Sequence, residues 1–326
     1  MDCKESIKEF CKSLGLELVG FTGCRLFTEL QSVFFQRKAR GIENEFEEQD
    51  IEKRINPFNY MKDGKTIISI AFPYFHGQNS KQKIHFSKYT LGKDYHVVLS
   101  AYFEKICSHI ETLGGKALYF ADNNSLPERY IAYLSGIGFI GKNNTLITKE
   151  YGSYVFLGEI ITDLEIEEDK PMQAGCGNCK LCADACPSGS LVSNNPNLCL
   201  SFITQKKDID EQWFSLLNGR LFGCDTCQEV CPYNHRVKES PVSDFAPLSF
   251  MEHPDIMELI SLNNKTFDEK YRKTSAGWRG KSILQRNALI NLFYSAGENM
   301  EPLRNLKFAS PRLQDIYNRL LRIFKL

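Results

Sequence analysis

The alternation of apolar and polar residues divides the first 165 residues of the chain into short strands and helices. Residues 66–72 are continuously apolar and rich in β-branched side chains, which is typical of a buried strand. Residues 94–112 repeat apolar positions with helical periodicity, and Gly114 and Gly115 follow the last turn. The same patterns predict helices over residues 1–15 and 127–135, and strands over residues 17–21, 116–120, 145–148 and 154–162. Strands interleaved with helices predict a layered α/β or α+β domain over residues 1–165.

Two further regions follow, and their composition differs from that of the first. An acidic connector with Pro and Gly runs over residues 165–175 and leads into a cysteine-rich segment, which we predict to be a second domain over residues 166–240. Residues 241–326 carry helical periodicity, which is best over 282–294 and 311–324. The predicted fold class is therefore α+β, with a layered N-terminal domain, a small cysteine-rich domain and a helical C-terminal segment.

Composition and charge argue against several classes of protein. Forty basic and forty acidic residues cancel, so the net charge alone indicates no partner. No apolar run approaches the roughly 18 residues that a membrane-spanning helix needs. The first residues are typical of an amphipathic helix rather than a targeting peptide, since Asp2 and Glu5 come early and Ile7, Phe10 and Leu14 share one face. We therefore expect a cytoplasmic protein in a reducing compartment, without membrane contact. We also expect it to be a monomer.

The balanced charge conceals a basic C-terminal segment. Residues 265–326 hold thirteen Lys and Arg against five Asp and Glu, interleaved with Tyr271, Trp278, Phe293 and Tyr294. A single-stranded nucleic-acid surface needs cations for the phosphates and flat rings for the unstacked bases. A solvated helical face produces the same run of charges, so this pattern alone leaves both interpretations open.

Eight of the twelve cysteines fall between residues 176 and 231 and form two runs. The first run reads C-x2-C-x2-C-x3-C-P and consists of Cys176, Cys179, Cys182, Cys186 and Pro187. The second run begins early, at Cys199, and ends in the same C-x2-C-x3-C-P with Cys224, Cys227, Cys231 and Pro232. This spacing is typical of bacterial ferredoxins with two 4Fe-4S clusters, in which the last cysteine of each run binds the other cluster.

The two runs predict two sets of cluster ligands. A short loop with three cysteines covers one face of a cubane cluster, so the fourth ligand must come from the other run. Cluster one is then held by Cys176, Cys179, Cys182 and Cys231, and cluster two by Cys186, Cys199, Cys224 and Cys227. Because such clusters move electrons one at a time, we expect a reductase with its chemistry in the first domain.

The eight cysteines also allow two other interpretations, zinc binding and disulfide bonding. Two zinc sites with four cysteines each are one alternative, but tetrahedral zinc motifs rarely carry a further cysteine at x3 spacing followed by Pro. A disulfide framework is the other alternative. It is disfavoured because we expect no signal peptide, and a chain of this length buries enough surface without cross-links.

The first domain lacks the phosphate-binding loops of nucleotide enzymes. Gly136, Gly138 and Gly141 are spaced G-x-G-x-x-G, but they follow a predicted helix instead of opening one. This context is wrong for a dinucleotide-binding fold. We interpret the three glycines as positions where the backbone approaches something large and flat.

Several stretches, in one order along the chain, resemble the epoxyqueuosine reductase family. They lie at residues 54–75, 88–96, 128–147 (ERYIAYLSGIGFIGKNNTLI), 151–169, 219–234 (GRLFGCDTCQEVCPYN) and 278–289. The family is cobalamin-dependent, contains two 4Fe-4S clusters and is related to the reductive dehalogenases. The resemblance implies a cobalamin-binding catalytic domain over residues 1–165, a ferredoxin-like two-cluster domain over 166–240 and tRNA contacts from 241–326.

The resemblance also implies an activity. The family reduces epoxyqueuosine to queuosine at the wobble position of a tRNA with a GUN anticodon. An external donor supplies electrons, which pass through the two clusters to a base-off cobalamin that rests as cob(II)alamin.

Asp122 is the proton donor that the resemblance implies, six residues before the pair Glu128-Arg129. An epoxide oxygen leaves poorly as an alkoxide, so a carboxylic acid must supply a proton. The family has a Pro three residues after this Asp, where this chain has Ser125 and places its Pro at position 127. An ordinary strand-end Asp that caps the next helix is the alternative interpretation of Asp122.

Further contacts follow from the resemblance alone. Substrate contacts are implied at Arg129, His96 and Thr204. Cobalamin contacts are implied at Arg54, Asp122, Lys142, Asn143, Leu146, Leu157, Ser201, Cys224 and Asp225. His96 is not expected to bind cobalt, because the D-x-H-x-x-G motif of some cobalamin proteins would need Gly where this chain has Leu99.

Two other functions stay open at this point. One is a cobalamin and iron–sulfur reductase of a small molecule such as an organohalide, and the other is a non-catalytic electron-transfer module. The basic C-terminal segment and the lack of a twin-arginine export signal favour the tRNA enzyme over the small-molecule reductase.

Overall fold

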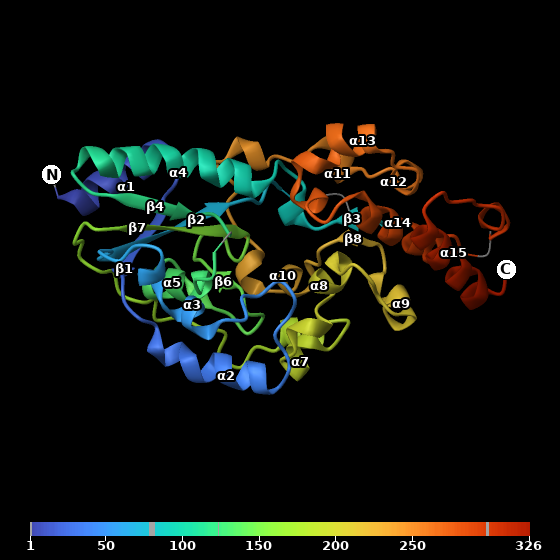
Figure 1. The fold of residues 1–326 in the computed structure, drawn as a ribbon, viewed down its shortest axis with the longest axis horizontal. Coiled ribbons are helices and arrows are strands. Elements are labelled where there is room, and N and C mark those ends of the chain that lie inside the picture. Colours follow the sequence, from blue (N-terminus) through green and yellow to red (C-terminus); the bar gives the residue numbers. More distant parts are fainter. Residues whose placement is uncertain (1, 78–81, 123, 298–299) are drawn as a thin grey trace.

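Residues 2–77, 82–122, 124–297 and 300–326 are described by a computed structural model. Figure 1 shows an elongated molecule in which a sheet with its helices lies toward one end of the long axis and the C-terminal helices lie at the other. The segment that carries the eight clustered cysteines lies between them. We call residues 1–165 the sheet lobe and residues 175–234 the cysteine segment.

A four-stranded antiparallel sheet forms the centre of the sheet lobe. Its strands lie in the order β1 (Leu18–Gly23), β2 (Thr66–Pro73), β7 (Val155–Thr162) and β4 (Ala117–Phe120). Every residue of β2 is buried, as its continuous apolar run predicted, because it is a central strand with helices on both faces. Since all three pairings are antiparallel, the α+β class is confirmed and the α/β alternative for this lobe is wrong.

The two faces of the sheet are covered by different helices. Helices α1 (Cys3–Ser13) and α4 (Tyr95–Thr112) cover one face, where Phe103 packs against Phe72 with ring centroids 5.3 Å apart. Helix α5 (Glu128–Leu134) covers the other face. Its end lies so close to β1 that a Cβ on Gly20 would fall 2.0 Å from the carbonyl oxygen of Ser135. The hydrophobic periodicity found these helices and strands within a few residues, because each buries one apolar face.

Short elements complete the sheet lobe, and the sequence pattern missed most of them. Helices α2 (Gln31–Ala39) and α3 (Ile51–Ile55) precede β2, and strands β5 (Phe139–Ile140) and β6 (Leu146–Ile147) form a small hairpin after α5. The hairpin explains the glycine spacing in this region. A Cβ on Gly138 would lie 2.4 Å from the carbonyl oxygen of Ile147, so the protein's own backbone occupies the space that we had assigned to a flat ligand.

The cysteine segment is built from helices of one or two turns. They are α6 (Leu181–Asp184), α7 (Ser190–Ser193), α8 (Leu200–Gln205), α9 (Phe214–Leu217) and α10 (Thr226–Glu229). Pro232 stands at the start of a 3-10 turn directly after Cys231, where its fixed φ angle is compatible with the turn and its missing N–H costs nothing. Cys182 lies within α6 and Cys227 within α10, whereas the other six cysteines lie on the segments that connect the short helices.

The C-terminal segment adds a second hydrophobic core. It contains α11 (Ser249–Glu252), α12 (Ile256–Ile260), α13 (Asn264–Glu269), α14 (Lys281–Ser295) and α15 (Pro311–Phe324), so both helices predicted for this segment are confirmed. This core also contains Phe86 and Leu91 from the first 165 residues, and β3 (His85–Phe86) pairs in parallel with β8 (Arg220–Phe222). The domain boundaries near residues 165 and 240 therefore stay a prediction, since the cores extend across them.

Candidate functional site

A large open cavity lies beside the sheet lobe. Its volume is about 920 Å³, and three segments line it: residues 46–53, Asn59 with Tyr60, and the loop that holds Asp122, Asn124 and Ser125. The lining is mostly polar, with carboxylates, amides and hydroxyls. A cavity of this size is near the upper end of what small-molecule and cofactor sites occupy.

Asp122 reaches this cavity from the loop that follows β4. Its backbone has φ +59°, a left-handed conformation that Asp and Asn tolerate better than most residues. Its side chain is 51% exposed. The Tyr95 hydroxyl donates a hydrogen bond to Asp122 Oδ2, and His96 Nε2 lies 3.7 Å from the same oxygen. The predicted proton donor and the predicted substrate contact His96 are therefore brought together, although they lie 26 positions apart.

The N-terminus of α4 supplies both partners of Asp122. Asp94 caps this helix, because its Oδ1 accepts the backbone N–H of His96 at 3.1 Å and lies 2.8 Å from His96 Nδ1. The Tyr95 ring stacks on Phe156 with centroids 4.4 Å apart, which fixes the direction of its hydroxyl. Partial burial lowers the pKa of His96, but the hydrogen bond and charge of Asp94 and the charge of Asp122 outweigh it, so the pKa is raised.

A buried and a half-buried carboxyl group, Glu159 and Glu128, lie near Asp122. Glu159 on β7 has no exposed surface, and among the described residues neither of its carboxyl oxygens has a hydrogen-bond partner. Burial, followed by the charges of Glu128 and Asp122, raises the pKa of Glu159 well above its ordinary value. Burial and the charge of Asp122 also raise the pKa of Glu128, to about 8, although Asn124 Nδ2 donates to it at 3.0 Å. Both groups therefore favour the protonated form at neutral pH.

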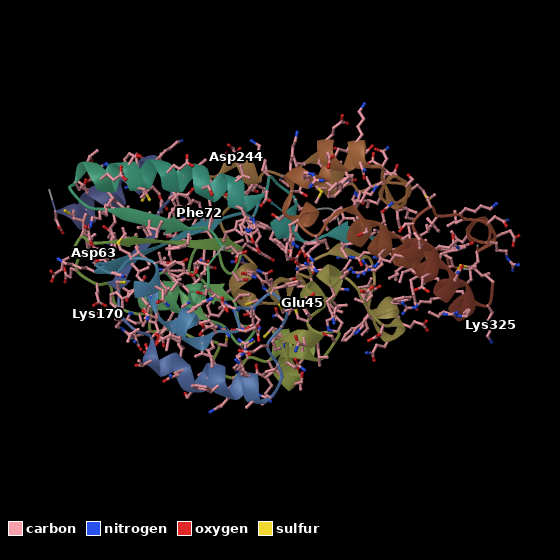
Figure 2. The ribbon with its side chains drawn as sticks, in the orientation of Figure 1. Glu45, Asp63, Phe72, Lys170, Asp244 and Lys325 are labelled. Carbon is pink, nitrogen blue, oxygen red and sulfur yellow. The ribbon has the colours of Figure 1, made fainter. Side chains whose placement is uncertain are left out.

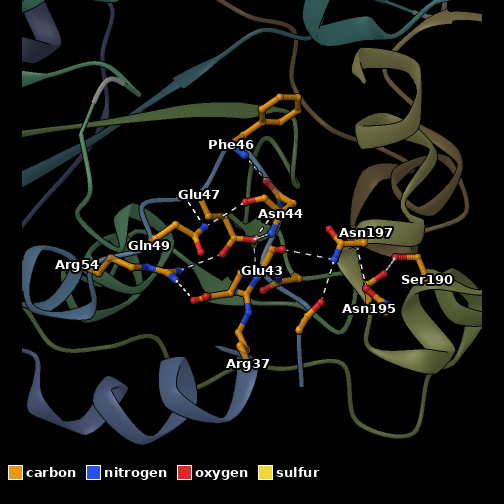
Figure 3. Close-up of polar contacts among 12 residues, drawn as sticks. Arg37, Glu43, Asn44, Phe46, Glu47, Gln49, Arg54, Ser190, Asn195 and Asn197 are labelled. Atoms are coloured by element: carbon orange, nitrogen blue, oxygen red, sulfur yellow. Dashed lines mark hydrogen bonds and ion pairs between the residues drawn. The ribbon is translucent and has the colours of Figure 1, made fainter. Parts of the chain in front are cut away.

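The loop that closes one side of the cavity is held by an ion-pair network. Arg54 donates to Glu43 at 3.1 Å and to Glu47 at 3.2 Å, and Arg37 donates to Glu47 at 2.6 Å. Figure 3 shows these contacts, together with Asn197 of the cysteine segment pointing at the backbone of the same loop. The structure thus places Arg54 behind the cavity wall, with an 11% exposed side chain. Its predicted contact with cobalamin stays a prediction.

The ligands predicted for cluster one share a small cavity. Cys176, Cys179, Cys182 and Cys231 all line it, together with Lys142 and Asn143. The backbone N–H of Lys142 donates to Cys176 Sγ at 3.4 Å, and Lys142 Nζ donates to the carbonyls of Gly177 and Cys179. The buried amide nitrogen of Asn143 has no hydrogen-bond partner and is available to a sulfur acceptor in this cavity.

The remaining four cysteines form a second group. Burial raises the pKa of the Cys199 thiol, backbone hydrogen bonds from Ser201 and Phe202 oppose the rise, and the charges of Cys224 and Cys186 add to it. The pKa of Cys227 is likewise raised by burial and by Cys224 and Cys199. Arg220 Nε donates to Cys224 Sγ at 3.2 Å. Among the described residues, no three His, Cys, Asp or Glu side chains converge on the space of a single metal ion.

Asp225 lies beside the second group of cysteines and is also a predicted cobalamin contact. Its Oδ2 accepts the backbone N–H of Lys88 at 2.8 Å, whereas its buried Oδ1 has no hydrogen-bond partner. Burial raises the pKa of Asp225, although the charge and hydrogen bond of Lys88 oppose the rise. An unpartnered buried oxygen costs free energy, so this group fits a place where a further donor arrives.

Thr204 and Ser201 lie on α8, directly after Cys199. Thr204 is fully buried, its hydroxyl donates to the Ser201 carbonyl at 2.9 Å and accepts the N–H of Gly223, also at 2.9 Å. The Thr204 side chain is thus committed to the fold. Its carbonyl accepts from Arg286, whose guanidinium has no carboxylate bonded to it and whose pKa burial lowers to about 9. Substrate contact by Thr204 stays a prediction.

The other predicted contacts lie around α5 and the hairpin. Arg129 follows Glu128 and donates to the carbonyl of Asn144, which links α5 to the turn that carries Lys142 and Asn143. Leu146 is buried and Leu157 is half-buried, and both pack in one cluster with Ala71 on the α5 side of the sheet. Lys142 and Asn143 lie at the first cysteine cavity, and none of these residues lines the large cavity. Their contacts with cobalamin stay predictions.

Sequence reasoning missed several residues of the site. The Tyr95 hydroxyl donates to Asp122, and Tyr60 lines the same cavity. The charge of Asp122 contributes to the raised pKa of Glu159. None of these three residues was predicted. One signal was present in the sequence. Glu159 is a charged residue inside the apolar strand VFLGEIIT, where a buried carboxyl group is unusual.

Comparisons with known proteins agree with this arrangement. Residues 175–234 match the 4Fe-4S double cluster binding domain family, and residues 54–123 match the epoxyqueuosine reductase QueG family. No helix in the described part of the chain is long and apolar enough to cross a membrane. These findings define an oxidoreductase with a 4Fe-4S binding domain.

Close relatives narrow this class to one family. The epoxyqueuosine reductase of Lactococcus garvieae is 34% identical over 96% of this chain and 90% of its own length, and that of Bacillus subtilis is 34% identical over 95% and 84%. A crystal structure of epoxyqueuosine reductase with an epoxyqueuosine-modified tRNA-Tyr stem loop matches with a TM-score of 0.90 and 33% identity, over 98% of this chain and 89% of that one. The enzyme from Streptococcus thermophilus matches with a TM-score of 0.87 and 31% identity over the whole of both chains. The chain belongs to the epoxyqueuosine reductase family.

Proposed function

We propose that this protein reduces epoxyqueuosine to queuosine at the wobble position of a tRNA with a GUN anticodon. Its relatives along nearly the whole chain are epoxyqueuosine reductases, and one similar enzyme was crystallised with an epoxyqueuosine-modified stem loop. The observation that carries the proposal is the position of Asp122, an exposed carboxyl group that lines the large cavity of the sheet lobe.

The reaction requires protons as well as electrons. Conversion of an epoxide to an alkene breaks both carbon–oxygen bonds, takes up two electrons and two protons, and releases one water molecule. Asp122 delivers a proton to the leaving oxygen, because an alkoxide is a poor leaving group. The hydrogen bond from Tyr95 occupies Oδ2 of Asp122, so Oδ1 is the oxygen that carries the transferable proton.

Residues around Asp122 prepare it for this step. The stacked Tyr95 ring and the capped N-terminus of α4 fix the direction of the hydrogen bond to Asp122. His96 lies at 3.7 Å from Oδ2, and its pKa is raised, so its positive charge stabilises the carboxylate that remains after proton transfer. Positioning of this kind accounts for a large part of what general acids contribute.

Two 4Fe-4S clusters are part of the proposal, and the thiols fit them. Cys176, Cys179, Cys182 and Cys231 line one cavity, where the unpartnered amide nitrogen of Asn143 supplies a donor to a sulfur acceptor. The second set, Cys186, Cys199, Cys224 and Cys227, has Arg220 donating to one of its sulfurs. All-thiolate ligand sets with this spacing are those of 4Fe-4S clusters.

A base-off cobalamin is the proposed cofactor beside Asp122. When bound, cobalamin would supply a cobalt centre that can reduce the epoxide carbons. An external donor would provide the electrons. The residues present fit such a group: the cavity is large, and Gln49, Asn59, Asn124 and Ser125 offer amides and a hydroxyl to the amide groups on the rim of a corrin. The polypeptide orients the substrate, excludes water and supplies the proton.

The basic C-terminal segment is proposed to contact the tRNA, but not with all of its charges. Arg286 is buried, and Arg312 and Arg319 form ion pairs with Asp208 and Glu211. These three arginines anchor the segment to the turns after α8 and before α9. Phosphate contacts are therefore expected mainly from the lysines of the segment and from Arg279.

The test is anaerobic reconstitution with iron, sulfide and cobalamin, followed by nucleoside analysis of tRNA that contains epoxyqueuosine. Queuosine must appear with the native enzyme. Asp122→Asn should bind cobalamin and iron normally but lose at least about 100-fold in kcat, since general acids contribute on this order. Asn tolerates the left-handed backbone at this position, so the loop keeps its shape.

The outcomes separate the possible functions. Full activity of Asp122→Asn would remove its role as the acid but leave the reaction intact. Iron–sulfur absorbance without cobalamin uptake or nucleoside conversion would instead indicate an electron-transfer module. A reductase of small molecules would show cobalamin uptake without salt-dependent tRNA binding.

A further inference from the structure

Three aromatic side chains from distant segments meet at the edge of the large cavity. Phe46 belongs to the loop that lines the cavity, Phe202 lies on α8, and Trp278 precedes α14. The Phe46 ring makes edge contacts with both others, and the ring centroids lie 5.2 Å apart in each pair. We call Phe46, Phe202 and Trp278 the aromatic rim.

Two cations, Arg279 and Lys206, lie close to the rings of the aromatic rim. The guanidinium of Arg279 lies 4.9 Å from the ring centroids of both Phe46 and Trp278. Lys206 Nζ lies 5.6 Å from the Phe202 centroid. Cations over ring faces are stabilised by the ring quadrupole and stay available to an anion in solvent.

Gln205 fixes the position of Trp278 and, together with Glu45, that of Arg279. Trp278 Nε1 donates to Gln205 Oε1 at 3.0 Å, and Arg279 Nε donates to the Gln205 carbonyl at 3.0 Å. Glu45 lies 3.7 Å from Arg279 and neutralises part of its charge. Figure 2 shows Glu45 near the middle of the molecule, between the sheet lobe and the cysteine segment.

The loop that carries Phe46 is fixed on its other side. Figure 3 shows Phe46 pointing away from the network in which Arg54 and Arg37 bind Glu43 and Glu47. The backbone N–H of Phe46 donates to Asn44 Oδ1 at 2.9 Å. The ring is therefore presented toward the cavity from a loop that is anchored by ion pairs.

Burial does not account for the aromatic rim. Phe202 packs partly against the C-terminal core, but Trp278 is 52% exposed and Phe46 is 39% exposed, so burial does not explain these two rings. Exposed clusters of large aromatic side chains mark interaction sites on proteins. Flat rings with cations beside them are suited to an unstacked nucleobase and the phosphate attached to it.

We propose that the aromatic rim stacks a nucleobase of the anticodon loop next to the modified wobble nucleotide, with Arg279 and Lys206 near its phosphate. The inference rests on the proposed function and adds a second binding site to it. A wobble nucleotide that turns into the cavity leaves its neighbour without a stacking partner, and the ring of Trp278 replaces that partner. The occupant is thus an unpaired base of the substrate RNA.

Intrinsic fluorescence tests the proposal directly. The chain has two tryptophans, Trp213 and Trp278, so the Trp213→Phe variant leaves Trp278 as the sole reporter. Its emission should be quenched when an epoxyqueuosine-modified anticodon stem loop binds, because a stacked base quenches an indole. A stem loop with an abasic residue in place of one neighbour of the wobble nucleotide should bind without quenching, and this identifies the stacked position.

Kinetics give an independent readout. Trp278→Ala should raise KM for the modified stem loop by about tenfold, in line with the loss of one stacked base, and leave kcat within about twofold. Trp278→Phe should restore most of the KM. Phe35→Ala is the matched control, because Phe35 is 56% exposed on α2 outside the aromatic rim, and its KM should equal that of the native enzyme.

Each outcome decides between the two proposals. Unchanged Trp278 emission on a stem loop whose binding is seen by anisotropy overturns the stacking proposal, as does an unchanged KM in Trp278→Ala. If the native enzyme converts no epoxyqueuosine, the proposed function fails, while quenching of Trp278 by the stem loop still supports the aromatic rim as an RNA site.

Discussion

In the sheet lobe, chemistry is placed by residues that lie far apart in the chain, whereas in the cysteine segment it is placed by short-range spacing. Asp122 depends on Tyr95 and His96 from α4, and Glu159 comes from the central strand β7. Three thiols of the first run, by contrast, lie within seven residues of each other in the chain and share one small cavity, which Cys231 of the second run completes. The lobe is thus stabilised by its own core, and the cysteine segment has helices of only four to six residues.

The two regions differ in the number of buried apolar side chains that stabilise them. Buried apolar side chains such as Phe103, Ile68 and Ile160 fill both sides of the sheet. Among the described residues, the first cysteine run packs on a small buried cluster with Phe139, Ile147 and Cys231, whereas residues 200–222 of the cysteine segment pack into the C-terminal core. We therefore expect bound clusters to contribute to the folding of the cysteine segment, as metals do in small metal-binding domains.

The largest expected effect comes from removing one thiol of the first group. Cys231→Ser should lower the iron content by half and abolish turnover, because the first cluster loses a ligand while the second group keeps all four. Iron analysis and visible absorbance measure this. Cys3→Ser is the control, since Cys3 lies outside both runs, and it should keep full iron. An unchanged iron content in Cys231→Ser would contradict the two ligand sets.

A core substitution in the sheet lobe should have the next largest effect. Phe103→Ala should lower the free energy of unfolding by about 3–5 kcal/mol, because Phe103 is fully buried against Phe72 and Gly158. Val192→Ala in the cysteine segment should change it by less than about 0.5 kcal/mol, since Val192 is 73% exposed. Urea unfolding of both variants measures the contrast. Similar losses would contradict the distinction between the two regions.

The buried carboxyl group predicts a pH dependence of stability. Glu159 keeps its proton in the folded protein because burial raises its pKa, whereas the unfolded chain ionises near 4.5. The folded state therefore binds more protons above this pH, so the free energy of unfolding falls as pH rises, up to and beyond the pKa of Glu128 at about 8.

Replacing Glu159 should weaken the pH dependence of the free energy of unfolding. At pH values above 5 at which the folded protein still holds the Glu159 proton, Glu159→Gln should reduce the slope by about 1.4 kcal/mol per pH unit, which is the value for one proton. Glu165→Gln is the matched control, because Glu165 is 87% exposed and should leave the slope unchanged. Chemical denaturation at a series of pH values gives the slopes. An equal slope in Glu159→Gln and the native protein would show that Glu159 is ionised in the fold.

The smallest expected effect concerns His96. Asp94→Asn keeps the helix cap, since Asn caps as well as Asp, but removes the charge that raises the pKa of His96. The pKa of His96 should fall, and its ring resonances measure it by NMR. A raised pKa of His96 stabilises the fold only at pH values below that pKa. The free energy of unfolding of the variant should therefore fall by well under 1 kcal/mol near pH 5 and by less near pH 8. A pKa that does not move would mean that Asp94 acts on His96 only as a cap.

Much of the fold could be predicted from the hydrophobic pattern. The four strands of the central sheet, the helices α1, α4 and α5 that cover it, and the helices α14 and α15 appear within a few residues of the predicted positions, whereas α2 was not predicted. Short elements such as α3, β5 and β8 could not be found, because two to five residues carry no usable periodicity. The antiparallel order β1-β2-β7-β4 was also out of reach, since it depends on pairings between distant strands.

The candidate site was predictable in part. The thiol sets followed from spacing, and Asp122 and His96 followed from the family resemblance. The structure uses the side chains of Arg54 and Thr204 within the fold, in an ion-pair network and in a buried hydrogen bond, and their contacts with cobalamin and substrate stay predictions. The basic segment shows a limit of the sequence, since counting its arginines does not reveal that Arg286 is buried.

The sequence by itself predicted the thiolate chemistry of the cysteine segment, because several thiols of each predicted set stand at short, fixed intervals that are visible in a sequence. It also determined which segments form the sheet and its covering helices. Only the tertiary structure decided that Tyr95 bonds Asp122, that Glu159 lies buried near it, and that Phe46, Phe202 and Trp278 meet at the cavity edge. Each of these contacts joins residues that are brought together by packing, and packing energies depend on all the elements at once.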